Sequence, residues 1–191
     1  STITGFEELL EGKVKSLHPK IFSGILANNK ERTNEEIIPF DLVAIDLYPF
    51  EQYLDKNIDE ETLFSNIDIG GVAILRAGAK NYQNVIVISD KKDYSIDLAL
   101  VDEKKRQELA LKAFIKTSKY DSIIAKKLSQ DFSIEQAYKV YNFSKIQDLR
   151  YGENPHQKAS LFSYNKEIDW ELLNGKEMSY NNFLDSTAAI E

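Results

Sequence analysis

Two segments of the chain are nearly continuous in apolar residues and predict buried β-strands. The segment 42–47 is apolar at all but one position and ends before Pro49, and the segment 84–89 contains four consecutive β-branched residues and ends at Asp90. Hydrophobicity that is unbroken rather than alternating is typical of strands covered on both faces, as in a parallel sheet. We therefore expect 42–47 and 85–88 to form adjacent parallel strands.

The residues around these strands predict helices. Segments 60–66 and 70–80 favour short helices separated by a turn at 68–71. From 103 to about 130, apolar residues recur at helical spacing with lysines and glutamates between them, which predicts the longest helix. Strands that alternate with helices in this order are typical of a doubly wound α/β domain.

The pattern changes around Asp148. Residues 148–155 predict a short strand that leads into a loop with glycine and proline, residues 159–164 predict another strand, and a helix follows from about Asn182. The chain stops at Glu191 without a helix stop signal. We therefore expect the sequence to be a truncated part of a longer protein.

Composition narrows the possible classes of function. The chain has 191 residues, 42% hydrophobic and 29% charged, as in soluble globular proteins. The absence of cysteine excludes disulfides and thiolate chemistry and fits a cytoplasmic protein, and two isolated histidines do not predict a metal site. A net charge of −7 argues against a general nucleic-acid or membrane surface. No apolar run approaches the roughly 20 residues that span a bilayer.

Two N-terminal stretches carry candidate binding residues. Within 12–20, three lysines and Ser16 surround a turn and suit an anionic ligand, although the run alone favours a solvated basic loop. Asp46 and Tyr48 follow a predicted buried strand, where ligands of open α/β sheets collect. An ordinary strand exit with a half-buried tyrosine explains the second stretch equally well.

The turn at 68–71 and the helix after it form a third candidate. Paired glycines at a helix start leave backbone N–H groups free to approach a ligand, and the helix dipole favours negative charge there. Asp68 is also explained as an ordinary N-cap, and Lys80 in the last turn as a complement to the dipole. For this stretch alone, the structural explanation is favoured.

A fourth candidate is the loop 149–157. It brings arginine, tyrosine, asparagine and histidine together, and Arg150 with Tyr151 suits a phosphate group. A structural turn is the alternative. None of the four stretches decides a function by itself.

Together, however, these stretches resemble one family. Six motifs occur in its order, namely VKSLHP at 14–19, DLYPF at 46–50, IDIGG at 67–71, RAGAKN at 76–81, LRYGENPHQ at 149–157 and SYNN at 179–182. Six motifs in one order are far more specific than any one of them. From about Thr4 to its end, the chain is therefore similar to the bifunctional AICAR transformylase / IMP cyclohydrolase family.

The resemblance implies two domains. Residues 1–143 would form the IMP cyclohydrolase domain, a methylglyoxal-synthase-like, doubly wound and mostly parallel α/β sheet that lacks the family's N-terminal strand. Residues 144–191 would form the beginning of a second α/β domain, the AICAR transformylase. The full-length parent is expected to be a cytoplasmic homodimer of de novo purine biosynthesis that binds small nucleotides and neither nucleic acid nor membrane.

The resemblance also implies two reactions. The first domain closes the purine ring of formyl-AICAR to give IMP and water, and the second transfers a formyl group to AICAR from its co-substrate 10-formyltetrahydrofolate. Cyclisation needs neither cofactor nor metal, because both reacting groups belong to one molecule. An amide nitrogen is a poor nucleophile, so a carboxylate near its proton and a cation near the formyl oxygen suit the reaction.

Site residues are carried over by motif. The expected catalytic residues, which we expect to converge on one cleft, are Lys15, Tyr48, Asp68 and Lys80. The expected substrate-binding residues are Lys13, Lys15, Ser16, Asp46, Asp68, Ile69, Gly70 and Gly71 for cyclisation and Arg150, Tyr151 and Asn182 for the transformylase. Which residue acts as acid and which as base stays open.

The chain departs from the family pattern at several points. The family's first strand and two phosphate-binding loops precede Ser1, so we expect this exact chain to be weak or inactive as a cyclohydrolase. Asp46 stands where asparagine is usual, which exchanges an amide donor for an acceptor. Ser16 replaces a threonine and Tyr82 replaces a histidine.

Two other classes of function compete with this interpretation. A non-catalytic regulatory module of the same fold, which binds phosphorylated effectors, explains the lysine loop and the glycine turn. It does not explain Tyr48, Asp68 and Lys80 together, nor the loop around Arg150. A unit that serves only folding or dimerisation is the third possibility.

Overall fold

The computed structural model describes residues 2–10, 12, 14–54, 58–135, 137–164 and 171–190. The chain divides into two compact units, Ser1–Glu135 and Gln136–Glu191. The family's domain boundary, expected at 143/144, stays a prediction, and each unit is described by itself below.

The first unit contains the expected parallel strands. β1 (Leu42–Ala44) pairs in parallel with β2 (Ile86–Ile88), with Leu42 opposite Ile86. β2 is buried along its whole length, whereas only Val43 is buried in β1. The expected adjacency of the strands is therefore confirmed, over shorter stretches, but the expectation that both faces are covered is wrong for β1, where Leu42 is 37% exposed.

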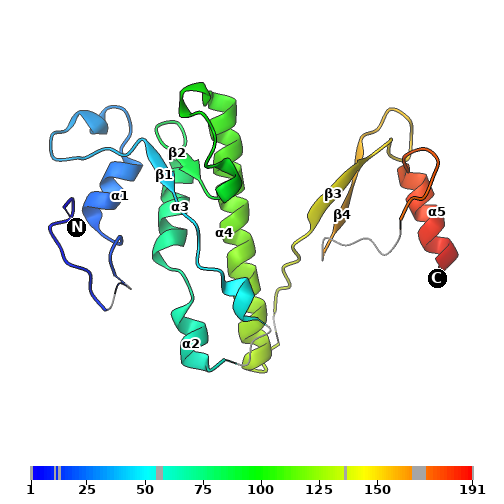
Figure 1. Ribbon diagram of the computed structural model, residues 1–191, viewed down its shortest axis with the longest axis horizontal. Helices are drawn as coiled ribbons and strands as arrows, with labels where there is room; N and C mark the ends of the chain where they lie inside the picture. Colours follow the sequence, from blue (N-terminus) through cyan, green and yellow to red (C-terminus); the bar gives the residue numbers. More distant parts are fainter. Residues whose placement is uncertain are drawn as a thin grey trace. The chain divides into compact units, whose positions relative to one another are not determined.

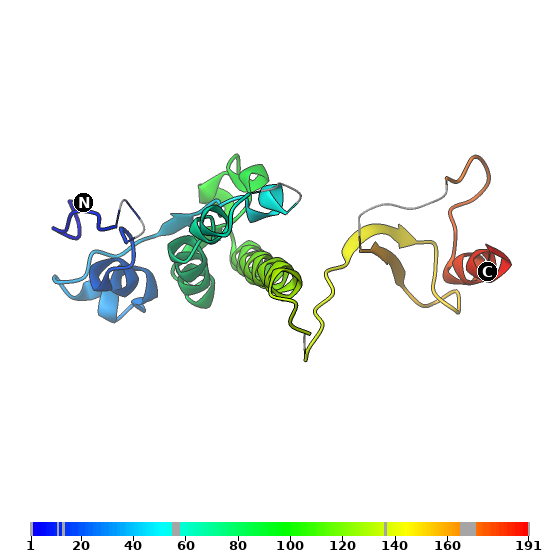
Figure 2. The ribbon, with the colours of Figure 1, turned by 90° about the horizontal axis from the view of Figure 1, so that it is seen from below.

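Two helices pack against this strand pair. α3 (Gly70–Lys80) and α4 (Glu103–Asp131) lie side by side in both views (Figures 1 and 2), and α3 contacts both strands whereas α4 contacts β2. Leu75 of α3 and Leu109 of α4 are almost completely buried with Val85 and Val87 in a common core. The first unit is thus a mixed α/β structure, in which α2 (Glu60–Ser65) precedes α3.

One helix of this unit was not expected. α1 (Pro19–Leu26) begins within the lysine-rich stretch that the sequence suggests is a loop. Pro19 occupies the first turn, where its missing N–H is harmless, and the Nδ1 atom of His18 accepts a hydrogen bond from the backbone N–H of Lys20 (3.1 Å). The proline and the cap are the local signals that mark this start.

The motif residue Asn81 joins α3 to α1. Its side-chain amide donates to the carbonyl oxygens of Ile25 (2.7 Å) and Ala27 (3.0 Å) at the end of α1. Its Oδ1 atom accepts from the side-chain amide of Asn84 (2.8 Å). These bonds satisfy carbonyl groups at a helix end, which explains an asparagine at this position by structure alone.

The second unit is smaller. β3 (Ser144–Leu149) pairs antiparallel with β4 (Ala159–Ser163), and α5 (Tyr180–Ile190) follows. β3 begins earlier than the strand expected at 148, and α5 begins two residues before the helix expected at 182.

In the first unit, short 3₁₀ helices cover Glu31–Thr33, Phe50–Tyr53, Lys91–Asp93 and Leu98–Leu100. Within the described ranges, no helix has the length and hydrophobicity required to cross a membrane.

Candidate functional site

An open pocket of about 1300 Å³ lies in the first unit, between the segment that follows β1 and the start of α3. It is lined by most of the residues expected for cyclisation, which are Lys15, Ser16, Asp46, Tyr48, Asp68, Ile69, Gly70 and Gly71. These residues come from three motifs that are well separated in the sequence. Two expected residues are not among them: Lys13 lies outside the described residues, and Lys80 lies at the other end of α3.

The start of α3 forms one wall of the pocket. Asp68 Oδ1 accepts a hydrogen bond from the backbone N–H of Gly71 (2.6 Å), as a capping side chain does. A Cβ atom at Gly71 would lie 2.4 Å from Asp68 Oδ2, and one at Gly70 would lie 3.2 Å from Ser16 Oγ. The paired glycines therefore let a carboxylate and a hydroxyl lie directly against the helix start.

Carboxylates dominate the charge of this pocket. Glu8, Asp46, Asp59, Glu61 and Asp68 line it, against Lys15 as the only cation among the described lining residues. Lys15 Nζ pairs with Glu8 Oε2 at 2.9 Å, but both side chains are more than half exposed, so this ion pair contributes little and exchanges readily. Such a lining favours the N–H groups of a ligand over a phosphate group.

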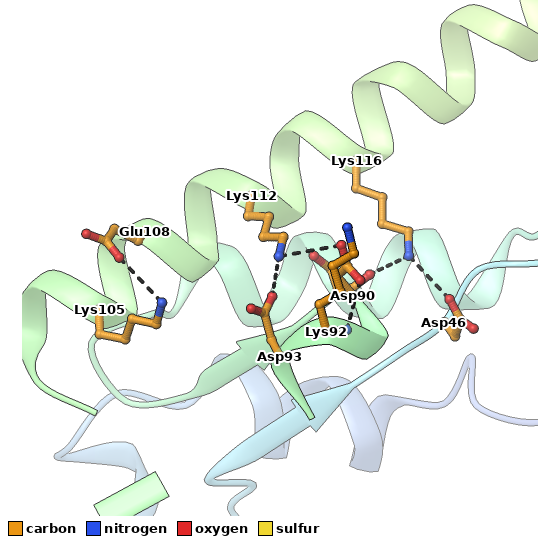
Figure 3. A network of polar contacts seen from close by, with 9 residues as sticks. Asp46, Asp90, Lys92, Asp93, Lys105, Glu108, Lys112 and Lys116 are labelled. Carbon is orange, nitrogen blue, oxygen red and sulfur yellow. Dashed lines mark hydrogen bonds and ion pairs between the residues drawn. The ribbon is translucent and has the colours of Figure 1, made fainter. Parts of the chain in front are cut away.

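Asp46 is held by two lysines at one edge of the pocket. Its Oδ2 lies 2.9 Å from Lys91 Nζ and its Oδ1 lies 3.3 Å from Lys116 Nζ, and Lys116 also donates to the backbone oxygen of Ser89. Figure 3 shows Lys116 of α4 extended toward Asp46. The hydrogen bond from Lys91, and then that from Lys116, holds the pKa of Asp46 below its ordinary value. Asp46 is therefore an ionised carboxylate, which can accept hydrogen bonds but cannot donate them.

The same helix contacts a second group of carboxylates. Lys112 pairs with Asp93 and lies 3.5 Å from Asp90, on the segment that follows β2 (Figure 3). Partial burial favours a lower pKa for Lys112, but its contacts with Asp93 and Asp90 outweigh this effect and raise that pKa. Lys91, Lys112 and Lys116 were missed by sequence reasoning because their partners are far away in the sequence or in different elements.

The paired Asp46 gives a prediction for stability against pH. Because its pKa is lower in the folded than in the unfolded state, its contribution to the free energy of unfolding is complete above the ordinary value of 3.8 and is lost as the pH falls through the folded pKa. In the Asp46→Asn variant, the free energy of unfolding, measured by urea denaturation, should therefore fall less steeply between about pH 5 and about pH 2 than in the unchanged protein. Asp121→Asn, at an exposed position of α4, is the control. An unchanged slope for Asp46→Asn would contradict the pairing.

Lys80 does not line this pocket. α3 is continuous from Gly70 to Lys80, and at a rise of 1.5 Å per residue its two ends are about 15 Å apart. The side chain of Lys80 is exposed. The expected convergence of Lys80 with Asp68 is therefore not found in the described chain, whereas Lys15, Tyr48 and Asp68 do line one pocket. The catalytic role of each residue stays a prediction.

The second unit brings together the residues expected for the transformylase. The Arg150 guanidinium lies 4.9 Å from the centre of the Tyr151 ring and donates to its hydroxyl (3.2 Å). Hydrogen bonds with Ser179, and then with Arg150, lower the pKa of Tyr151. Asn182 Oδ1 accepts from both the backbone N–H and the hydroxyl of Ser179 (3.0 Å each), so this carbonyl oxygen caps α5.

Comparison with known proteins identifies the family. A model of the AICARFT/IMPCHase bienzyme matches residues 78–191. The chain belongs to this bienzyme family. A bifunctional purine biosynthesis protein PurH of Persephonella marina is 44% identical over 211 residues, and one of Bacillus subtilis is 41% identical over 210 residues. Each alignment covers 100% of this chain and 41% of the relative, so the chain spans about two fifths of the length of these bienzymes.

A solved structure shares the fold of much of this chain. The crystal structure of ForH has a TM-score of 0.58 and 31% sequence identity, and the match covers 67% of this chain and 72% of that chain. The family model and the relatives confirm the resemblance inferred from six motifs at the level of the bienzyme family. The match to the family model contains the Arg150 loop and the start of α5, and the alignments with the relatives also cover the pocket motifs.

Proposed function

We propose that the first unit carries the IMP cyclohydrolase site of a longer bifunctional enzyme, referred to below as the full-length enzyme. The observation that supports this most strongly is the pocket at the start of α3, where three separate family motifs meet around Asp68. The proposal includes the methylglyoxal-synthase-like fold, with β1 and β2 as part of its parallel sheet.

The reaction begins with the carboxamide nitrogen of formyl-AICAR, which attacks the formyl carbon. A C–N bond forms, the carboxamide nitrogen loses one proton, and the formyl oxygen gains negative charge and is protonated to a hydroxyl. The formamide nitrogen then loses its proton as the ring C=N bond forms, and the hydroxyl takes up a second proton and leaves as water. Asp68 accepts a hydrogen bond only through Oδ1 among the described contacts, so Oδ2 is available to take the amide proton. Ser16 Oγ and the backbone N–H of Gly70 at the start of α3 lie where donors can stabilise the developing oxyanion.

Protonation of the leaving oxygen requires a donor from the opposite wall of the pocket. Tyr48 is half exposed, and among the described residues Lys15 is bound only through its solvated ion pair with Glu8, so both are available for this step. The ionised Asp46 accepts an N–H of the ligand where the family's asparagine would donate. No cofactor takes part, because the nucleophile and electrophile are already held in one molecule.

The second unit contributes to the AICAR site of the transformylase. Arg150 supplies paired N–H donors to the nucleotide phosphate, and Tyr151 supplies a hydroxyl beside them. The co-substrate of this second reaction is 10-formyltetrahydrofolate. The full-length enzyme acts as a cytoplasmic homodimer in purine synthesis, with formyl-AICAR, AICAR and IMP as its small-molecule partners.

Turnover without folate tests the proposed function. The full-length enzyme, supplied with formyl-AICAR alone, should form IMP, measured by its absorbance and by chromatography. Binding of IMP in a calorimeter without any turnover would contradict the proposal and would instead support a regulatory module.

A further inference from the structure

The buried hydroxyl of Tyr120 holds the turn that carries Asp68. The backbone N–H of Asp68 donates to Tyr120 Oη (2.8 Å), and this hydroxyl donates in turn to the backbone oxygen of Asn66 (3.3 Å). Tyr120 lies on α4 and is only 9% exposed. One side chain from a distant helix thus takes part in two hydrogen bonds to the segment that enters α3.

The ring of the same tyrosine contacts the segment that follows β1, which contributes Tyr48 to the pocket. It packs edge-on against Phe50, with ring centres 6.3 Å apart, and Phe50 is almost completely buried. The backbone N–H of Phe50 donates to the carbonyl oxygen of Tyr48 (2.8 Å), so the position of Phe50 is tied to that of Tyr48. Tyr120 therefore contacts both the segment that carries Asp68 and the segment that carries Tyr48, and both of these residues line the pocket.

Neighbouring residues of α4 form ion pairs with the same segment after β1. Lys116 pairs with Asp46, and Lys119 pairs with Glu51. Residues 119 and 120 lie three and four positions after residue 116, so the three residues share one side of the helix. Tyr120 itself does not line the pocket, so it acts on the site only through the segments that it holds.

We propose that Tyr120 is a positioning residue of the cyclisation site, where its hydroxyl fixes the turn at Asn66–Asp68 and its ring fixes the turn after Tyr48. This inference rests on the proposed function. Burial raises the pKa of Tyr120, which keeps the hydroxyl neutral and able both to donate and to accept at neutral pH. Without the hydroxyl, the Asp68 N–H loses its partner and the carboxylate loses its fixed position relative to Tyr48.

Tyr120→Phe in the full-length enzyme tests this role, because phenylalanine keeps the contact with Phe50. The kcat for cyclisation should fall about ten- to hundredfold with a much smaller change in KM, and formyl transfer should be unchanged. Tyr94→Phe, at an exposed tyrosine of the same unit, is the matched control. A wild type that does not cyclise formyl-AICAR would refute the proposed function, whereas an active wild type with an equally active Tyr120→Phe would refute the positioning role alone.

A double-mutant cycle separates positioning from plain stability. In an Asp68→Asn background, Tyr120→Phe should change kcat little, because the group that it positions is already gone. Equal fractional losses in both backgrounds would contradict an action through Asp68. If Tyr120→Phe does not fold, the proposed bond is tested instead by hydrogen exchange of the Asp68 amide in the unchanged protein. Strong protection is expected for an N–H bonded to a buried hydroxyl, and unprotected exchange would overturn the proposal.

Discussion

Asp68→Asn should lower the rate of IMP formation from formyl-AICAR by about 10²- to 10⁴-fold, the range that general base catalysis contributes. Asparagine has nearly the same shape, and its side-chain oxygen can still accept the bond that Asp68 Oδ1 accepts from Gly71 N. It cannot take a proton from the amide nucleophile. The loss should therefore fall on kcat, measured in steady state with the full-length enzyme, while the protein stays folded.

The control for this substitution is Asp102→Asn. Asp102 also accepts a backbone N–H at a helix start, from Lys105 at 2.7 Å, but it does not line the pocket around Asp68. Its substitution tests what the loss of an aspartate charge at a helix start does by itself. A less than about threefold effect of Asp68→Asn on kcat would contradict the assigned role in proton transfer.

Arg150→Ala should impair formyl transfer and leave cyclisation intact, the reverse of what is expected for Asp68→Asn. Alanine cannot supply the paired guanidinium donors that hold a phosphate, and a lost charge-assisted hydrogen bond is worth about 1.5–3 kcal/mol. Formyl transfer to AICAR should therefore fall roughly ten- to hundredfold in kcat/KM, and cyclisation of supplied formyl-AICAR should barely change. Both reactions are measured on the same full-length preparation.

Lys145→Ala provides a matched loss of positive charge in the same unit. Lys145 pairs with Asp148 on β3 and is about half exposed, so its removal should affect neither reaction. Equal damage to both activities by Arg150→Ala would show that the loop maintains the structure rather than one site.

The elements that the sequence predicts best are those with a strong local pattern. β2 is a run of β-branched residues, and α4 combines helical periodicity with the capping residue Asp102, so both are found where expected. α1 has only eight residues and follows a basic stretch, and its start is marked by little more than Pro19. The exposed face of β1 could not be predicted, because its residues are as apolar as those of a buried strand.

The candidate site shows a different limit. Family motifs predict which residues line the pocket, including Ser16 and Asp68, but they do not give distances. A continuous helix over 70–80 places Lys80 about 15 Å from Gly70, so helical geometry already separates Lys80 from the turn that carries Asp68. The contacts of Asp46 with Lys116 and of Asp68 with Tyr120 join residues more than 50 positions apart, and no local pattern reveals such pairs.

The most direct test of the central claim is to map where IMP binds on the full-length enzyme, by the amide NMR shifts of the ¹⁵N-labelled protein. Binding at the start of α3 should shift the amides of Ser16, Asp68, Gly70 and Gly71, and Asp68→Asn should reduce these shifts. Shifts confined to residues such as Tyr151 and Ser179 in the second unit, with Gly70 and Gly71 unmoved, would contradict the assignment of the cyclisation site to this pocket.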